Sequence, residues 1–279
     1  MPSAFQVLSV RDTSLRSELL EMPRVEYEDR GFWERKWTAE EEIEKKAQEE
    51  ESWRERVDGE DYFDRIVLKE ARGKSVLDIG CGRGEFMLAV AAVATKVAGV
   101  DFSRNAISRA IVNTSLQGVT NVELRLANAR SISYSDESFD LVYCRRGPAT
   151  HNLKTAREAH RVLKHGGRFI EEEIGEKDKL NWKQTFGRGQ NYPFKESISM
   201  EKSKLLARAG FNKTRIKEFE ASEFFKSIKD VVMRLETTPI IPNFSKVKDR
   251  KHLQDLERKC TTRKGIKTNT HRVIVIAAK

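Results

Sequence analysis

The sequence predicts a doubly wound α/β fold built on a mainly parallel sheet. From residue 74 onward, short apolar segments alternate with amphipathic ones, and the first apolar segment leads directly into a glycine-rich turn, Gly80-Cys-Gly-Arg-Gly84. Regular alternation of strands and helices is typical of a parallel sheet with helices on both faces. We therefore expect one such sheet, with the glycine-rich turn at the end of its first strand.

The N-terminal part is expected to be helical. Thr38-Ala-Glu-Glu41 has the form of a capping box, with a carboxylate at the third helical position. The helix that it opens would continue to about Val57, with Trp53 among its few apolar anchors, so we expect it to lie across a domain surface. We predict that residues 1–58 form an N-terminal helical extension or cap and that residues 59–279 form the main domain.

Seven strands and five helices follow in chain order. The predicted strands are Ser75–Ile79, Lys96–Val100, Val122–Leu126, Leu141–Cys144, Arg168–Ile174, Thr214–Phe219 and His271–Ala278. The predicted helices are Glu85–Ala94, 104–117 with Ser103 as its cap, Thr155–Lys164, 195–209 before Gly210, and Ser222–Leu235.

Charge is distributed unevenly along the 279 residues, which carry a net charge of +9. Residues 1–60 hold 10 Lys and Arg against 17 Asp and Glu, whereas residues 177–279 hold 25 against 11. A basic region can attract anionic partners such as RNA or phosphorylated metabolites. The alternative is a solvated surface whose charge is balanced by the acidic N-terminal segment.

Composition excludes several classes of protein. No apolar run approaches the roughly 20 residues that cross a bilayer, and the N-terminus lacks the pattern of a secretory signal. Three scattered cysteines form no disulfide framework, and no His/Cys group has the spacing of zinc ligands. We expect a cytoplasmic protein with no membrane partner and no metal.

The glycine-rich turn predicts a nucleoside site. In an open parallel sheet the ligand lies beyond the carboxyl ends of the strands, where glycines let the backbone approach it and a helix N-terminus presents free N–H groups. Asp101 ends the second strand, 21 positions after Gly80, where a carboxylate can accept hydrogen bonds from both hydroxyls of a ribose. Asp78 precedes the turn and would repel a pyrophosphate but suits an ammonium group.

The segment Val76-Leu-Asp-Ile-Gly-Cys-Gly-Arg-Gly-Glu-Phe86 closely resembles the first motif of class I S-adenosylmethionine-dependent methyltransferases. The resemblance extends over about residues 60–175, with VAGVDFS, ANAR, FDLVYC and HRVLKHGGRFI in the family's order, and the C-terminal part resembles small, poorly characterised bacterial methyltransferases. It implies a seven-stranded Rossmann-like sheet whose last strand enters antiparallel, in a hairpin with the strand before it. A basic insertion at about residues 220–270 would then cover the site together with the N-terminal extension.

The resemblance also implies S-adenosylmethionine as cofactor and a set of residues that bind it. Asp101 would hold the ribose hydroxyls, with Phe102 against the adenine. Asp78 would lie near the ammonium group, or else have a purely structural role at the turn. The family usually has an acidic residue where this chain has Asn128, whose side-chain oxygen can still accept a hydrogen bond from the adenine amino group. The predicted cofactor-binding residues are Asp78, Gly80, Cys81, Gly82, Gly84, Asp101, Phe102, Asn128 and Ala129.

The acceptor side is less defined by sequence. Methyl transfer from a sulfonium needs alignment and, for some acceptors, a base. His151 is the candidate base, and the alternative is an exposed, idle side chain. Arg145 and Arg146 could bind a carboxylate or phosphate of the acceptor, or form salt bridges to the N-terminal helix. The Glu171–Glu173 carboxylates alternate in direction and could line the acceptor pocket.

These observations predict a methyltransferase that acts on a small molecule. The first alternative is an RNA methyltransferase that uses the basic C-terminal region, although this region carries few aromatic residues for stacking on bases. The second alternative is a cofactor-binding partner subunit without catalysis.

Overall fold

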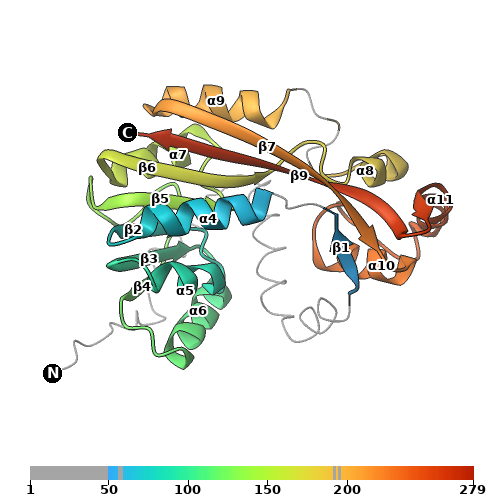
Figure 1. Ribbon diagram of the computed structural model, residues 1–279, viewed down its shortest axis with the longest axis horizontal. Coiled ribbons are helices and arrows are strands. Elements are labelled where there is room, and N and C mark those ends of the chain that lie inside the picture. Colours follow the sequence, from blue (N-terminus) through green and yellow to red (C-terminus); the bar gives the residue numbers. More distant parts are fainter. Residues whose placement is uncertain (1–49, 56–58, 191–192, 194–195) are drawn as a thin grey trace.

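The computed structural model describes residues 50–55, 59–190, 193 and 196–279. Nine strands form one sheet in the order β1-β7-β9-β6-β5-β2-β3-β4, with β8 paired to β9 (Figure 1). Their bounds are β1 Ser52–Arg54, β2 Ser75–Ile79, β3 Lys96–Asp101, β4 Val122–Leu126, β5 Phe139–Arg145, β6 Leu163–Ile174, β7 Asn212–Phe225, β8 Thr261–Thr262 and β9 Gly265–Ala278.

Strand direction confirms the predicted doubly wound arrangement. Strands β2 to β6 are parallel, and β9 lies antiparallel between β6 and β7. The chain passes from β2 outward to β3 and β4 and then returns to β5 on the other side of β2. The order of the strands therefore reverses between β2 and β5, which is where a ligand site is expected in such a sheet.

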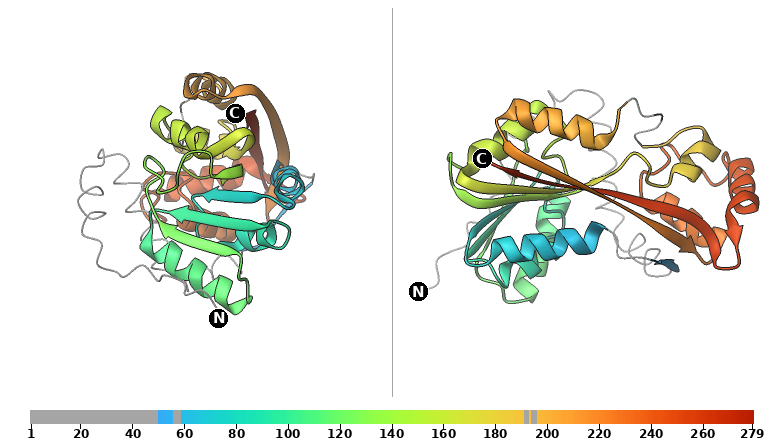
Figure 2. Two further views of the ribbon diagram at one scale, coloured as in Figure 1. Left: turned by 90° about the vertical axis from the view of Figure 1, so that its left-hand side faces the viewer. Right: turned by 45° about the horizontal axis from the view of Figure 1, so that its top comes forward.

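Helices cover both faces of the sheet (Figures 1 and 2). Their bounds are α4 Gly59–Ala71, α5 Glu85–Ala91, α6 Arg104–Leu116, α7 Leu153–Val162, α8 Leu180–Phe186, α9 Ile198–Ala209, α10 Ile228–Thr237 and α11 Arg250–Cys260. Buried apolar side chains of α4, α5 and α6 form a core on one face, and those of α7 and α9 form a core on the other. Successive side chains of β2 point to opposite faces of the sheet and contribute to both cores: Leu77 and Ile79 join one core, and Val76 joins the other.

The prediction of seven strands was short by two. The additional strands are β1, which pairs antiparallel with the end of β7, and β8, which pairs with the start of β9. Residues 52–54 were predicted to be helical, but they form an edge strand in which Trp53 stacks on Phe224 with ring centroids 5.8 Å apart. Residues 50, 51 and 55 of the predicted N-terminal helix are not helical either, and its remainder lies outside the described residues, as do residues 1–49 altogether.

The hairpin of β7 and β9 extends well beyond the rest of the sheet. Each strand has 14 residues, more than the predicted spans of 214–219 and 271–278, and β7 takes up the start of the helix predicted at 222. The far halves of both strands carry a third apolar core, which they share with α8, α10 and α11. Only α10, of these three helices, was expected, since α8 has just seven residues and α11 is rich in charged residues.

Candidate active site

The glycine-rich turn connects β2 to α5 at the reversal point of the sheet. Gly80 and Cys81 both donate backbone hydrogen bonds to the carbonyl of Val100 in β3, at 2.8 and 3.1 Å. Gly84 has φ +76° and precedes the first residue of α5, a conformation that favours glycine. The turn therefore follows the neighbouring strand and leaves the N-terminus of α5 at the carboxyl edge of the sheet.

Asp101 fastens this turn to the end of β3. Its side chain is 9% exposed, and its two oxygens accept hydrogen bonds from the backbone N–H of Gly82 at 3.0 Å and of Ser103 at 2.9 Å. A carboxylate has lone pairs for further donors, so ribose hydroxyls can be accepted beside these bonds. Phe102 is half-buried next to it, and Cys81 is buried under the turn.

Asp78 is a buried acid, and its hydrogen-bond partner was not predicted from the sequence. It is 4% exposed, and the hydroxyl of Tyr143 on β5 donates to its Oδ2 at 2.8 Å. Burial raises the pKa of Asp78 to about 7, partly offset by this hydrogen bond from Tyr143, which favours the ionised form. The tyrosine within the FDLVYC strand was the sequence signal for the pair.

Asn128 and Ala129 follow β4 at the same edge. The side-chain oxygen of Asn128 accepts the backbone N–H of Arg130 at 3.0 Å, and its carbonyl accepts the N–H of Ser131 at 2.9 Å. Ala129 is buried. The side-chain oxygen of Asn128, which was predicted to contact the adenine, thus already accepts a hydrogen bond within its own turn. Only its second lone pair is available to a ligand.

Arg145 and Arg146 form salt bridges, but their partners lie on α4 and β6, whereas most of the N-terminal helix of the alternative interpretation lies outside the described residues. Arg145 lies 3.1 Å from Glu172 of β6 and 3.7 Å from Glu60 of α4, while Arg146 lies 3.6 Å from both carboxylates. Charged partners, Arg146 first, lower the pKa of Glu60 to about 2 despite its burial. The positive charges of Arg145 and Arg146 are therefore balanced by carboxylates of the protein itself.

His151 lies in the same loop, between β5 and α7. Its side chain is 56% exposed, and its Nε2 is 4.0 Å from Glu173 Oε2. Behind it, Lys202 of α9 binds Glu173 at 2.8 Å and the hydroxyl of Thr150 at 2.6 Å, and Thr150 in turn donates to Glu171.

The pKa values of the two carboxylates in this cluster are shifted in opposite directions. Burial raises the pKa of Glu171 to about 7, whereas Lys202 and His151 hold the pKa of Glu173 below its usual value against the effect of burial. One oxygen of Glu171 is buried without a hydrogen-bond partner among the described residues. Lys202 was missed in the sequence, although a lysine at position i+4 from Ile198 and i−4 from Leu206 lies within the apolar stripe of α9.

The loop that carries these acceptor-side residues touches the glycine-rich turn. A Cβ at Gly80 would lie 2.9 Å from Cδ of Pro148, and one at Gly147 would lie 2.9 Å from the carbonyl oxygen of Ile79. Glycine at both positions permits this close approach. The glycine-rich turn and the β5–α7 loop are therefore in contact at the carboxyl ends of the paired strands β2 and β5.

Comparison with known sequences identifies this arrangement. The profile of the family described as methyltransferase domain matches residues 70–207, which include the turn, Asp101, the β5–α7 loop and the buried carboxylates. Residues 70–207 are a class I S-adenosylmethionine-dependent methyltransferase domain. The glycine turn, the acid at the end of β3 and the buried acid before the turn fit the ribose and amino-acid ends of this family's cofactor.

Relatives agree with the domain assignment. An uncharacterised methyltransferase, YcgJ of Bacillus subtilis, is 36% identical over 119 residues, which is 41% of this chain and 46% of the relative. The demethylmenaquinone methyltransferase of Bacillus velezensis is 26% identical over 144 residues, or 50% of this chain and 59% of the relative. The matched part of the methyltransferase domain thus spans about half the length of these curated relatives.

Solved structures share the fold. The crystal structure of YcgJ superposes with a TM-score of 0.59 at 20% identity, covering 78% of this chain and 98% of YcgJ. A functionally unknown protein from Deinococcus radiodurans superposes with a TM-score of 0.57 at 18% identity, covering 82% and 91%. Among the described residues, no helix combines the length and apolar character that a membrane span needs.

Proposed function

We propose that the protein transfers the methyl group of S-adenosylmethionine to a small-molecule acceptor. The observation that carries this proposal is the glycine-rich turn fastened to Asp101 within a methyltransferase domain, directly beside a loop with a histidine and two arginines. The relatives with a named substrate are demethylmenaquinone methyltransferases, whose acceptor is a small molecule, and this supports the same class here. The three free cysteines fit a reducing, cytoplasmic location.

The cofactor contacts follow from the geometry of the turn. S-adenosylmethionine supplies, when bound, an electrophilic methyl group on its sulfonium. Asp101 would orient the ribose, and Phe102 and Asn128-Ala129 would border the adenine. The backbone from Gly80 to Gly84 would enclose the amino-acid end, with Asp78 in its ionised form close to the ammonium group.

On the acceptor side, His151 would accept the proton that the acceptor loses on methylation. It is exposed at the mouth of the site, and ionised Glu173 behind it favours the protonated imidazolium once the proton is taken up. Arg146, with 39% of its side chain exposed against 24% for Arg145, is the better candidate for an anionic group of the acceptor. To bind Arg146, that anionic group would have to displace the carboxylate of Glu60 or Glu172.

Label transfer tests the proposal. Purified protein and S-adenosylmethionine with a labelled methyl group are incubated with a cell extract, which is then separated into RNA, protein and small-molecule fractions. Label among the small molecules is expected, and a Gly82→Val variant should abolish it. Label in RNA would overturn the small-molecule acceptor, and label nowhere despite cofactor binding would favour the non-catalytic partner subunit.

The RNA alternative has its own test in salt dependence. Binding of a polyanion through phosphate contacts weakens steeply between about 50 and 200 mM salt. We expect the protein to leave a heparin column at low salt, because many basic side chains of the C-terminal region are paired with carboxylates, as Lys264 is with Glu55 and Arg258 with Asp255. Retention to high salt would favour RNA.

A further inference from the structure

We infer that Arg145 binds the carboxylate at the amino-acid end of S-adenosylmethionine, beside the ammonium group that Asp78 binds. The inference rests on the cofactor contacts of the proposed function and adds a residue to them, and it leaves Arg146 to the acceptor. The amino-acid end of this cofactor is a zwitterion. An acid alone matches only its positive half, and a cation near Asp78 would match the other half.

Arg145 is the last residue of β5, at the edge of the sheet where the glycine-rich turn lies. Side chains two positions apart share one face of a strand, so Arg145 points to the same face as Tyr143, whose hydroxyl is 2.8 Å from Asp78 Oδ2. Burial raises the pKa of Asp78 to about 7, and the charge of Arg145 is among the influences that lower it. Arg145 therefore lies on the same side of the sheet as the Asp78–Tyr143 pair and acts on it electrostatically.

Aromatic rings support the guanidinium group of Arg145. Its central carbon lies 5.2 Å from the ring centroid of Phe86 and 5.9 Å from that of Phe63. Phe86 is the second residue of α5, close behind the glycine-rich turn, and its ring centroid is 5.6 Å from that of Tyr143. A planar guanidinium group packs well on aromatic faces. The contact with Phe86 thus places Arg145 beside the start of α5, where the amino-acid end of the cofactor is expected.

The guanidinium group has donors to offer to a ligand carboxylate. Its Nε donates to Glu172 at 3.1 Å. One terminal nitrogen is 3.4 Å from Asp64 Oδ1, an oxygen without a hydrogen-bond partner among the described residues, and the other is 3.7 Å from Glu60. Two N–H groups of an arginine match the two oxygens of a carboxylate. With 24% of its side chain exposed, Arg145 can present these donors to a ligand.

Asp64 of α4 is the acid that a bound carboxylate would displace from Arg145. Its side chain is 36% exposed, and burial raises its pKa even though Arg145 is close to it. Glu60 depends less on Arg145, because Arg146 and Arg272 lower its pKa to about 2 against the effect of burial. A ligand carboxylate can therefore take the place of Asp64 while Glu60 keeps its other partners.

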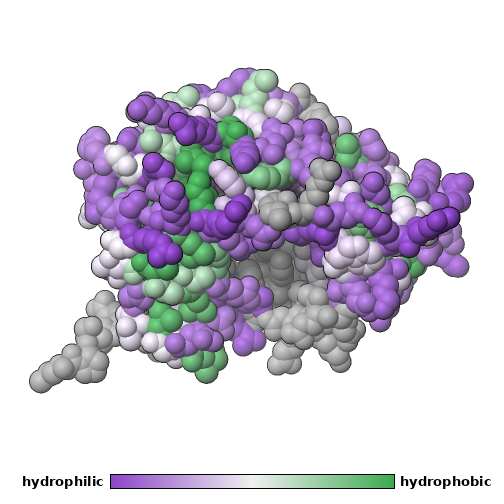
Figure 3. Space-filling model, in the orientation of Figure 1, coloured by the Kyte–Doolittle hydropathy of each residue, from purple (hydrophilic) through white to green (hydrophobic). Residues whose placement is uncertain are grey.

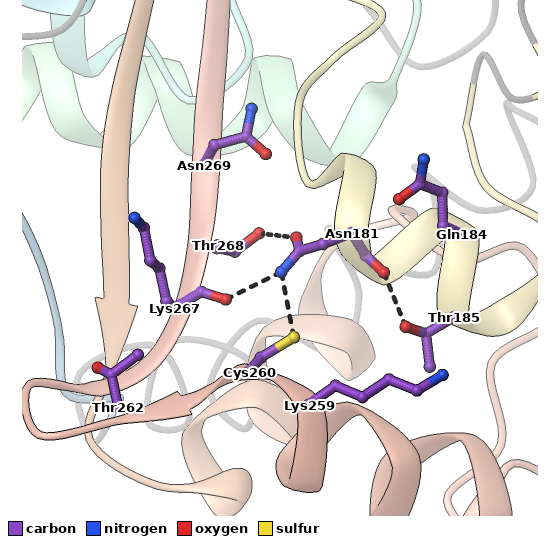
Figure 4. Close-up of a pocket in the computed structure, with 9 residues that line it drawn as sticks. All are labelled: Asn181, Gln184, Thr185, Lys259, Cys260, Thr262, Lys267, Thr268 and Asn269. Atoms are coloured by element: carbon purple, nitrogen blue, oxygen red, sulfur yellow. Dashed lines mark hydrogen bonds between the residues drawn. The ribbon is translucent and has the colours of Figure 1, made fainter.

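The cavity at the far end of the β7–β9 hairpin offers no such pair of charges among its described lining residues. Figure 3 shows mostly hydrophilic side chains over this end of the molecule, as is typical of a solvated surface. The lining of the cavity includes Lys259 and Lys267, whose ammonium groups point apart, and contains no acid (Figure 4). The ammonium group of a zwitterion would lack a partner there, whereas Asp78 and Arg145 present both charges.

Calorimetric titration of the full chain with S-adenosylhomocysteine and with its decarboxylated analogue, which keeps the amine, tests the inference. The titrations are made at about pH 8, where Asp78 is mostly ionised. Arg145→Gln should weaken binding of S-adenosylhomocysteine about tenfold, because it removes a charge-assisted contact, and should not weaken binding of the analogue. Asp78→Asn should instead weaken both ligands. Asp64→Asn should strengthen binding of S-adenosylhomocysteine about twofold, because a competing acid is removed.

The matched control is Arg168→Gln, which removes an arginine that also pairs with a carboxylate of α4, Glu70, but lies further back along β6. Its affinity for both ligands should stay within about twofold of the unchanged chain. Arg145→Lys keeps the charge without the paired donors and should bind with intermediate affinity. Equal weakening of both ligands by Arg145→Gln, or unchanged affinity for S-adenosylhomocysteine, would overturn the inference and leave the proposed function standing. Failure of the unchanged chain to bind S-adenosylhomocysteine would overturn both.

Discussion

At the scale of single residues, Asp101 has the most constrained position in the site. Its carboxylate holds the glycine-rich turn through Gly82 and the start of α6 through Ser103. We expect Asp101→Ala to lower the affinity for S-adenosylhomocysteine by about tenfold or more, because charge-assisted hydrogen bonds contribute roughly 1.5–3 kcal/mol. Calorimetric titration measures this. The control Asp61→Asn changes an exposed acid of α4 and should leave affinity unaltered, and an unaffected Asp101→Ala would contradict the assigned role.

Asp78 predicts a pH dependence of cofactor binding. Because burial raises its pKa to about 7, the carboxyl is mostly protonated at pH 6 and mostly ionised above 7. An ammonium group binds the ionised form, so affinity for S-adenosylhomocysteine should rise about fivefold to tenfold between roughly pH 6 and 7.5. Asp78→Asn should remove this rise.

Tyr143→Phe provides a second test of the same acid. The hydrogen bond from Tyr143 favours the ionised carboxylate, so its removal should raise the pKa of Asp78 and move the binding transition to higher pH. Affinity that rises equally in Asp78→Asn and in the unchanged chain would favour the purely structural role of Asp78 at the turn.

Some contacts of the site could be predicted from the sequence, and others could not. The turn and Asp101 follow a fixed spacing on adjacent strands, so their meeting was predictable. The pair of Asp78 and Tyr143 depends on the register of β2 against β5, which places these two residues opposite each other. Register between strands 65 positions apart is set by tertiary packing, and the sequence pattern does not contain it.

At the scale of elements, α9 carries a lysine into a buried cluster of two carboxylates. Removing one member of a buried ion network leaves the others without compensation. We expect Lys202→Met to lower the free energy of unfolding by about 3–5 kcal/mol. Urea denaturation measures it, with Lys204→Met, an exposed position on the same helix, expected to change stability by less than about 1 kcal/mol. Equal effects of the two variants would contradict a stabilising role for the cluster.

The β8–β9 turn contains a glycine that its geometry requires. Gly265 has φ +112°, and a Cβ there would lie 2.4 Å from the carbonyl oxygen of Phe225. Gly187 also has positive φ, at +66°, but has open space around it. Gly265→Ala should therefore lower the urea midpoint clearly more than Gly187→Ala, for which conformational strain of about 1–2 kcal/mol is the whole cost. Similar midpoints would show that the hairpin shifts to relieve the contact.

Element types followed from the sequence better than element lengths. Four of the five parallel strands lie close to their predicted spans, and the fifth, β6, begins five residues earlier than predicted. The far halves of β7 and β9 mix polar and apolar residues, and they become strands because they pair with each other and, in β7, with β1. Residues 52–54 show the same effect, since pairing with β7 overrides the helical preference of a charged segment.

At the scale of the whole molecule, the third apolar core lies apart from the two that flank the central sheet. Leu256 of α11 and Leu206 of α9 are both fully buried, the first in this third core and the second beneath α7 and β6. Each Leu→Ala change should cost about 2–5 kcal/mol. Hydrogen exchange should show lost protection in α8, α10 and α11 for Leu256→Ala and across the central sheet for Leu206→Ala.

Cofactor affinity should separate the two variants as well. Leu256→Ala should bind S-adenosylhomocysteine within about twofold of the unchanged chain, because local unfolding of one unit leaves the other intact. If Leu256→Ala exposed the amides of β2 and β3 to exchange, the third core would belong to a single cooperative unit. Sequence reasoning placed an insertion here but not its own core, since the contributing residues are spread over more than 80 positions.

The contact between Gly80 and Pro148 couples the binding of the two ligands. The turn that would hold the cofactor and the loop that carries His151 touch without space for even one additional carbon. When a ligand orders one of these segments, the other loses freedom at the same moment, and part of the entropic cost of binding the second ligand has then been met. We expect positive cooperativity, in which a bound methyl donor raises the affinity for the acceptor and a bound acceptor raises the affinity for the donor by the same factor.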